Sequence, residues 1–307
     1  MSKITVLVHG LGNIGQAVIR SVEGAPDMEC LGVVRSPASV GTKKMELRGL
    51  SDFDSLEALI KAKGKPRAAI ICGPSRLAPD DAARYLAAGL HTVDSFDIHG
   101  QVPAVVERLE KEAVKAGRAA ITAAGWDPGT DSVLRALFEA MAPVGTTFTN
   151  FGRGRSMGHS VAARAVEGVA DAVSLTIPIG GGRHSRLVYV LPESGAAPEA
   201  IRAALAADDY FSHDPLDVRF VADAAELALA ADNSHGVLME RLGASGAASN
   251  QRFSFDMRID NPALTAQVLA ACARAATRLS PGAYTLIDVP PVALLPGDRM
   301  SHVARLV

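Results

Sequence analysis

Two aspartates follow successive apolar runs of the 307-residue sequence and stand at positions where acid-base chemistry is common. Asp97 follows one run, and Asp127, directly after Trp126, follows the next. The carboxyl ends of parallel strands share one sheet edge, where ligands bind, so we expect both carboxylates at one site. They could bind a substrate ammonium group and take its proton before hydride leaves the adjacent carbon. The alternative, capping of a turn or helix, is the interpretation we favour for Asp94.

A glycine-rich loop near the N-terminus forms a second candidate site. Gly10, Gly12 and Gly15 make a GxGxxG motif between an apolar run and a helical pattern. The first glycine permits a tight turn, the second a close approach of the pyrophosphate, and the third close packing of helix on strand. The helix N-terminus, with Asn13 and Ile14, would offer N–H groups to the anion. The motif predicts a dinucleotide site rather than a glycine turn without a ligand.

The residues after the second and third apolar runs extend this cofactor site. An enzyme that uses NAD has an acid at the end of the second strand to bind the ribose hydroxyls. Here Arg35 and Ser36 occupy that place, and a guanidinium with a hydroxyl suits a 2′-phosphate, so NADP(H) is favoured. An exposed loop arginine is the alternative. Cys72, Pro74 and Ser75 follow the third run and are expected beside the cofactor.

The second half of the chain holds polar candidates for a substrate carboxylate and amine, namely Thr176, Arg183, Arg186, His235 and Asn261. An arginine fork suits a carboxylate because charge-assisted bidentate bonds are strong. The alternatives are a surface salt bridge for either arginine and a structural role for His235.

Hydrophobic periodicity predicts the elements that position these residues. The first part of the chain alternates short apolar runs with helical patterns, which favours a parallel sheet covered on both faces. The expected strands are 4–8, 28–34, 67–72, 90–94 and 118–123, with a helix at 13–23 and another containing Val102, Val105, Val106 and Leu109.

From about residue 145 the pattern changes to strands without intervening helices. Segments 146–151, 186–191 and 217–222 are strand-like, and 252–260 alternates strictly, which predicts an antiparallel strand with one wet or partner-facing side. Residues 150–160 are too rich in glycine for a strand.

A helix is expected over 261–279, with Asn261 as N-cap and Pro262 at its first position, followed by a strand at 283–289. The fold class is therefore α/β, a Rossmann-type parallel-sheet domain plus an α+β substrate and dimerisation domain with antiparallel strands. We expect the domains to span 1–125 and 126–261, with 262–307 packing back onto the first.

Composition narrows the range of partners. Lys and Arg number 31 against 33 Asp and Glu, a balance that argues against binding to nucleic acid or an anionic membrane. No apolar run approaches a membrane span. Three separated cysteines without CxxC spacing suggest neither disulfides nor a metal site, so we expect a reducing cytoplasm.

Several blocks together resemble the meso-diaminopimelate dehydrogenase family, particularly its shorter, broad-specificity type. The blocks are GLGNIG, HTVDSFDIHG, AGWDPGTDS, TNFGRGRSMGHS, SHGVLMERLGASGA and RIDNPALTAQV, and they run nearly end to end. The resemblance implies an NADP(H)-dependent homodimer. Its reaction would be reversible oxidative deamination of the D-centre of meso-2,6-diaminoheptanedioate, giving L-2-amino-6-oxoheptanedioate and ammonia.

The resemblance also implies roles for individual residues. Those expected at the reacting D-amino centre are Asp97, Trp126 and Asp127. Met157 and Gly158 would hold its carboxylate through backbone N–H groups, and Phe151 would wall the pocket. The residues expected at the distal L-centre are Thr176, Arg186, His235 and Asn261.

The chain departs from the family pattern in two places. Arg35 is followed by Ser36 rather than a second arginine, which could weaken selectivity for NADP, and Arg153 and Arg155 add charge near the expected pocket mouth. Two other functions remain open: a reductase of the dihydrodipicolinate or 2-oxo acid aminating type, which could act on simple D-amino acids, and a non-catalytic NADP-binding sensor.

Overall fold

The computed structural model describes residues 3–42, 45–230 and 235–307. The chain divides into two compact units. The first unit comprises Met1–Ala136 and Pro262–Val307, and the second comprises Leu137–Asn261.

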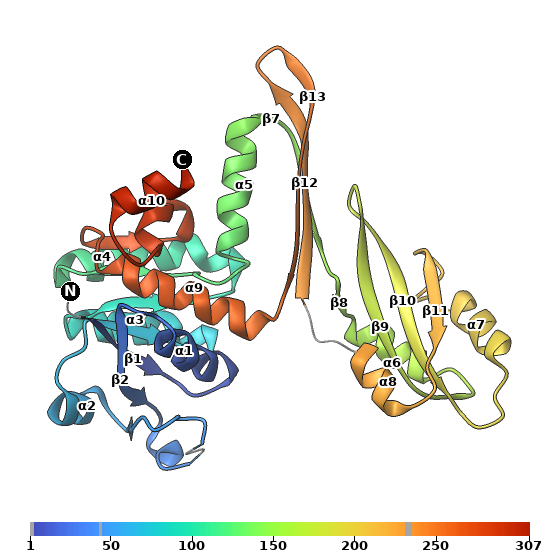
Figure 1. The fold of residues 1–307 in the computed structure, drawn as a ribbon, viewed down its shortest axis with the longest axis horizontal. Coiled ribbons are helices and arrows are strands. Elements are labelled where there is room, and N and C mark those ends of the chain that lie inside the picture. The colour runs from blue at the N-terminus through green and yellow to red at the C-terminus, as the bar shows by residue number, and fades with distance from the viewer. Residues whose placement is uncertain (1–2, 43–44, 231–234) are drawn as a thin grey trace. The chain divides into compact units, whose positions relative to one another are not determined.

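The first unit (Figure 1) is built on a sheet that has seven strands in the order β3-β2-β1-β4-β5-β6-β14. The strands are β1 (Ile4–His9), β2 (Met28–Val34), β3 (Asp52–Phe53), β4 (Ala68–Ile71), β5 (His91–Asp94), β6 (Ala119–Ile121) and β14 (Gly282–Tyr284). Every pairing is parallel. The strand order reverses between β1 and β4, and in such sheets ligands bind beyond the strand ends at that point.

The five strands predicted in this unit are confirmed, and two details of the prediction need correction. Strand β3 was missed because two residues carry no readable periodicity. The strand expected over 283–289 is limited to Gly282–Tyr284, and the 3-10 helix η4 (Leu286–Asp288) follows it.

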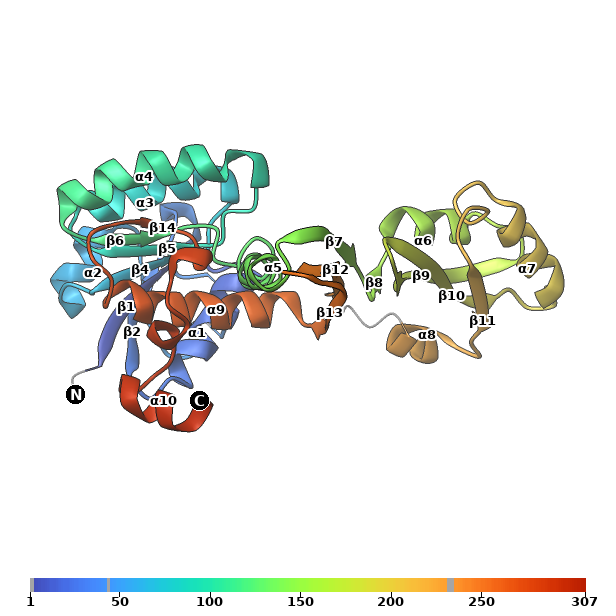
Figure 2. The same cartoon turned by 90° about the horizontal axis from the view of Figure 1, so that it is seen from above.

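Helices cover both faces of this sheet, as Figure 2 shows. Two separate hydrophobic clusters account for the cover. One joins the sheet to α1 (Asn13–Glu23) and α9 (Asn261–Ala276), and the other joins it to α2 (Leu56–Lys63), α3 (Ala78–Ala87) and α4 (Val102–Ala116). Burial on both faces explains why the strands read as continuous apolar runs.

The remaining elements of the first unit are short. They are α10 (Arg299–Leu306) and the 3-10 helices η1 (Pro37–Ser39), η2 (Ser75–Leu77), η3 (His99–Gln101) and η5 (Pro291–Leu294). Helix α5 (Thr130–Met141) begins after the Trp126 turn, and the division between the units falls within it.

The second unit contains two further sheets. One has the order β11-β10-β9-β8 and the other β13-β12-β7. Their strands are β7 (Val144–Phe151), β8 (Gly154–Arg155), β9 (Val169–Gly180), β10 (Arg183–Pro192), β11 (Leu216–Phe220), β12 (His235–Ser245) and β13 (Ala248–Ile259). The helices are α6 (Met157–Arg164), α7 (Pro198–Ala207) and α8 (Ala224–Ala230).

The alternating segment 252–260 lies on β13, which pairs with β12 in antiparallel register, as predicted. Its apolar side chains are half-buried and the intervening polar ones are exposed. The expectation that 150–160 contains no strand was wrong. Gly154 and Arg155 form β8 against β9, because an edge pairing of two residues tolerates glycine, and α6 begins two residues later.

Candidate active site

The glycine loop between β1 and α1 has the geometry that the motif predicts. A Cβ on Gly10 (φ +93°) would lie 3.0 Å from the carbonyl oxygen of Cys72, and a Cβ on Gly15 would lie 2.2 Å from that of Gly10. A Cβ on Gly12 would meet nothing within 4 Å. Gly10 and Gly15 are therefore required by close packing, whereas Gly12 leaves open space in front of the α1 N-terminus that a ligand can enter.

A cavity of about 710 Å³ lies at this point of the first unit. The predicted cofactor residues that line it are Gly10, Gly12, Arg35, Ser36 and Pro74. Those that do not are Asn13, Ile14, Gly15, Cys72 and Ser75. Asn13 and Ile14 form the first turn of α1, where no side chain caps the helix. Backbone N–H groups are the only contribution those two residues need to make to an anion.

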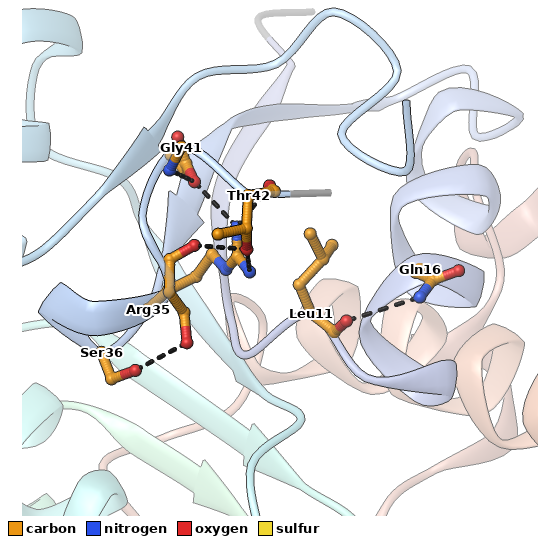
Figure 3. Close-up of polar contacts among 8 residues, drawn as sticks. Leu11, Gln16, Arg35, Ser36, Gly41 and Thr42 are labelled. Atoms are coloured by element: carbon orange, nitrogen blue, oxygen red, sulfur yellow. Dashed lines mark hydrogen bonds and ion pairs between the residues drawn. The ribbon is translucent and has the colours of Figure 1, made fainter. Parts of the chain in front are cut away.

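Arg35, at the end of β2, is buried with 8% of its surface exposed, so it is not an exposed loop arginine. Its Nη1 donates to the Asp52 carboxylate at 2.8 Å and to the Thr42 carbonyl at 3.0 Å, and Nη2 donates to the Thr42 hydroxyl at 2.9 Å. Figure 3 shows the guanidinium directed at Thr42. The charge that the sequence offers to a 2′-phosphate is thus already paired with Asp52.

Asp52 also organises the loop that follows Arg35. The Gly41 N–H donates to its carboxylate at 2.9 Å, and Ser36 and Ser39 share a hydrogen bond between their hydroxyls at 2.9 Å. Burial alone would raise the pKa of Asp52, but the Gly41 N–H and the Arg35 guanidinium together lower it below its usual value. Hydroxyls of this loop line the cavity beside Arg35.

A polar cluster on the cavity wall was not predicted from the sequence. His9 Nδ1 lies 2.8 Å from the Tyr85 hydroxyl, and His9 Nε2 lies 3.2 Å from the Asp81 carboxylate. Burial would raise the pKa of Asp81, but its bond to His9 lowers it overall. His9 immediately precedes the glycine motif, but its partners on α3 are more than 70 residues away and no local pattern joins them.

The aspartates at the strand ends differ in exposure and in hydrogen bonding. Strands β5 and β6 are parallel neighbours, so Asp97 and Asp127 follow adjacent strands. Asp97 is exposed before η3. Asp94 is buried and accepts hydrogen bonds from the Phe96 N–H at 3.0 Å and the Thr122 hydroxyl at 2.8 Å. The prediction that Asp94 caps a turn is confirmed.

The turn that contains Trp126 is tightly folded. A Cβ on Gly129 would lie 1.8 Å from the carbonyl oxygen of Gly125, so only glycine fits there. Asp127 Oδ1 accepts an ion-pair hydrogen bond from Arg135 Nη1 at 2.7 Å, and the Asp127 side chain is only 5% exposed. Trp126 is half-buried. The turn therefore presents an indole beside a carboxylate that already has one cationic partner.

A second carboxyl lies in the first turn of α5 and was not singled out from the sequence. Asp131 is fully buried, its N–H donates to the Trp126 carbonyl at 2.9 Å, and neither carboxyl oxygen has a hydrogen-bond partner among the described residues. Burial first, and then the Asp127 charge, raise its pKa to about 6, while Arg135 opposes the shift. Asp131 lies four residues after Asp127 and four before Arg135, and this spacing could have identified it in the sequence.

In the second unit, two predicted residues are in direct contact. Thr176 on β9 and Arg186 on β10 are opposite each other in the antiparallel ladder, and Arg186 Nη1 donates to the Thr176 hydroxyl. Arg186 Nε donates to the Asp214 carboxylate at 2.7 Å. Arg183 begins the same strand and is exposed.

The other predicted residues of this unit lie at the ends of elements. Phe151 ends β7 with 47% of its surface exposed, His235 begins β12, and Asn261 is the first residue of α9 rather than the residue before it. Met157 and Gly158 begin α6, and the side chain of Met157 lies outside the described part of the structure. Arg153 and Arg155 are exposed.

The described residues contain neither a membrane-spanning helix nor a cluster of metal ligands. No helix among them is long and apolar enough to cross a membrane. Within residues 3–42, 45–230 and 235–307, no group of three or more His, Cys, Asp or Glu side chains could hold a metal ion.

Two family models match the chain. The model for an oxidoreductase family with an NAD-binding Rossmann fold matches residues 4–93. The model for the diaminopimelic acid dehydrogenase C-terminal domain matches residues 125–182. The first match covers the glycine loop and β4, and the second covers the Trp126 turn, β7 and all of β9.

Relatives and solved structures match over the full length. The meso-diaminopimelate D-dehydrogenase of Bacteroides fragilis is 44% identical and covers 100% of both chains, and that of Lysinibacillus sphaericus is 34% identical over 94% of this chain and 95% of its own. The structure of C. glutamicum DAP dehydrogenase in complex with DAP superposes with a TM-score of 0.70 at 28% identity, covering 100% of both chains. An engineered D-amino acid dehydrogenase bound to NADP+ gives 0.68 at 27% identity with the same coverage.

Proposed function

The chain belongs to the meso-diaminopimelate D-dehydrogenase family of amino acid dehydrogenases, and from this premise we propose its reaction. The reaction is the reversible, NADP-dependent oxidative deamination of the D-amino centre of meso-2,6-diaminoheptanedioate to L-2-amino-6-oxoheptanedioate and ammonia. The observation that carries the proposal is the pairing of two features in the first unit. A glycine-loop cavity lies at the reversal of strand order, and a buried carboxylate follows β6 of the same sheet.

The residues of the cavity fit a nicotinamide dinucleotide phosphate. Gly12 leaves the approach to the α1 N-terminus open, which suits a pyrophosphate. No acid stands at the end of β2 to bind ribose hydroxyls, and Arg35, Ser36 and Thr42 line the cavity there. When bound, the cofactor supplies the acceptor for the hydride. We assign the 2′-phosphate to the hydroxyls and N–H groups of this loop, with Arg35 as a partly neutralised cation behind them.

The protein itself needs to hold the amine, remove a proton and shape the pocket. Asp127 and Asp97 bind the substrate ammonium group, and Asp127 accepts a proton from it as hydride leaves the carbon. Trp126 provides an apolar wall and one N–H donor. Water then adds to the resulting imine and ammonia leaves. No covalent nucleophile is required, because the cofactor carries the redox chemistry.

The distal amino acid centre is assigned to the second unit. Arg186, already aligned by Thr176 and Asp214, offers remaining guanidinium donors to a carboxylate. His235 and Asn261 complete this part of the site. Met157 and Gly158 at the start of α6 offer backbone N–H groups to a substrate carboxylate, and Phe151 offers an apolar side chain.

A homodimer is part of the proposal. In the described structure β13 is the edge strand of its sheet and pairs with β12, and its apolar side chains are half-buried. Large apolar side chains are also exposed around the end of α5 and on β7 and β12, namely Leu137, Met141, Val144 and Leu242. Exposed apolar surface of this kind marks a protein interface. A second copy of the chain is the occupant we propose, and light scattering after size-exclusion chromatography tests it.

A direct assay separates the candidate functions. The purified protein is incubated with NADP+ and, in turn, meso-diaminopimelate, its L,L and D,D isomers, and D-alanine. Reduction of NADP+ with the meso isomer supports the proposal. Activity confined to simple D-amino acids or to 2-oxo acids with ammonia supports an aminating enzyme of another type. Binding of NADP+ without any turnover supports a sensor.

A further inference from the structure

Asp131 is a buried carboxyl that the proposed reaction does not use. It is fully buried in the first turn of α5, and both of its oxygens lack a hydrogen-bond partner among the described residues. A carboxylate in that position without a partner is costly, by several kcal/mol or more. The group must therefore hold a proton or gain a cationic neighbour.

Among the described residues, one cation, Arg135, acts on Asp131 beside a second carboxyl, Asp127. Arg135 follows it by four residues, which places both on one face of α5. The Arg135 guanidinium is already bonded to Asp127 at 2.7 Å. Asp127 and Arg135 are the charged groups that act on Asp131 in the described structure. Two adjacent carboxyls with a single counter-charge are stable when one of them keeps a proton.

We propose that in mildly acidic solution Asp131 holds a proton while no amine occupies the site, and that it releases this proton when a cationic amino group binds at Asp127. The bound ammonium group supplies the second positive charge, and Arg135 can then be shared with Asp131. The proton passes from the Asp131 carboxyl to solvent, and no bond of the substrate changes in this step. Asp131 is a positioning residue, because it sets the charge of the site through its neighbours.

This inference rests on the proposed function, because it requires an ammonium group beside Asp127. It makes substrate binding depend on pH in a defined direction. Below about pH 6 the proton must be displaced before the amine binds, so affinity falls as the pH is lowered, by up to about tenfold per pH unit. Above this range Asp131 is already ionised and the dependence ends.

The test measures proton release directly. The enzyme saturated with NADPH, which cannot accept a hydride, is titrated calorimetrically with meso-diaminopimelate at pH 6 in two buffers of different ionisation enthalpy. We expect release of about half a proton from Asp131 on binding, since the group is about half protonated there. Asp131→Asn, an isosteric mimic of the neutral acid, should bind the substrate more weakly than wild type and lose this release. Asp80→Asn, in the exposed first turn of α3, is the matched control and should behave as wild type.

A second measurement needs neither substrate nor cofactor. Asp131 has a raised pKa in the folded state, so the wild type loses stability relative to Asp131→Asn as pH rises from about 4 to 7. The variant should therefore melt at the same temperature as wild type at pH 4.5 and several degrees higher at pH 7.5.

The outcomes separate the inference from the proposed function. Equal proton release in wild type and Asp131→Asn, or a melting difference that does not change with pH, overturns the role of Asp131 while the proposed function stands. No binding of meso-diaminopimelate by the wild type overturns both.

Discussion

Arg35 and Asp52 form an ion pair at 2.8 Å, with side chains that are only 6% and 11% exposed. The cation at the end of β2 is therefore bound to the protein itself before any cofactor arrives. If the proposed function is right, this pairing couples the stability of the first unit to selectivity for the cofactor phosphate.

Substituting Arg35 alone should destabilise the protein more than substituting Arg35 and Asp52 together. Arg35→Ala leaves a buried carboxylate near the cofactor phosphate, so we expect a loss of about 3 kcal/mol in unfolding free energy. The substitution should also weaken the binding of NADP+ more than it weakens the binding of NAD+. Arg35→Ala with Asp52→Ala should recover part of both losses. Thermal melts and fluorescence titrations of the two cofactors measure this, and additive effects of the two changes would contradict the pairing.

Gly12 and Gly15 should respond to alanine in opposite ways. Gly12→Ala adds a Cβ in open space, so the protein should fold normally while its Kd for NADP+ rises about tenfold or more. Gly15→Ala places a Cβ 2.2 Å from the Gly10 carbonyl oxygen and should lower the melting temperature by several degrees. The prediction fails if Gly12→Ala binds NADP+ as tightly as wild type.

Asp127 should be needed for turnover and not for the cofactor. Asp127→Asn removes the proton acceptor, so kcat/KM for oxidation of meso-diaminopimelate should fall by about 10²- to 10⁴-fold. The Kd for NADP+ should stay within about twofold, because Asp127 does not line the cofactor cavity. Steady-state kinetics beside a cofactor titration provide the check. Unchanged turnover would remove Asp127 from the reaction.

Arg186 should discriminate substrates with two amino acid centres. Arg186→Ala should raise KM for meso-diaminopimelate by about tenfold or more, the scale of one charge-assisted hydrogen bond. It should change KM for D-alanine little, since that substrate has no distal carboxylate. Arg183→Ala, on the same strand and exposed, is the matched control. Equal increases for both substrates would argue against a distal clamp.

His91 should make the fold sensitive to acid. Burial, and then the charges of Arg118 and Arg67, lower the pKa of His91 to about 4, and its Nδ1 accepts the Ala119 N–H at 3.1 Å. The unfolded chain binds a proton near pH 6.5 but the folded one does not, so stability is full above 6.5 and declines from 6.5 towards 4.

Thermal melts of wild type and His91→Gln between pH 7.5 and 4.5 test this sign. The variant keeps an acceptor without a titratable group, so its melting temperature should fall less on acidification. Parallel curves for the two proteins would show that another group controls the acid limb.

Local patterns in the sequence predicted most of the regular structure. The apolar runs became β1, β2, β4, β5 and β6, and the GxGxxG spacing became a tight turn before α1. These features depend on side chains a few residues apart, which is the range over which periodicity and glycine geometry act. The two-residue strands β3 and β8 escaped prediction because their pairing depends on a distant strand rather than on their own residues.

In the candidate site, too, some features depend on nearby residues and others on distant contacts. The residue types and their places after strands predicted an anion-binding loop, a carboxylate beside Trp126 and the capping role of Asp94. The tertiary structure alone decided which polar side chains meet: Arg35 with Asp52, His9 with Asp81, and Asp127 with Arg135. It also decided that Asp131 is buried without a hydrogen-bond partner among the described residues. Burial and pairing set the proton affinity of a carboxyl, and both depend on side chains brought together by packing, so the sequence could name the acids but not their charge.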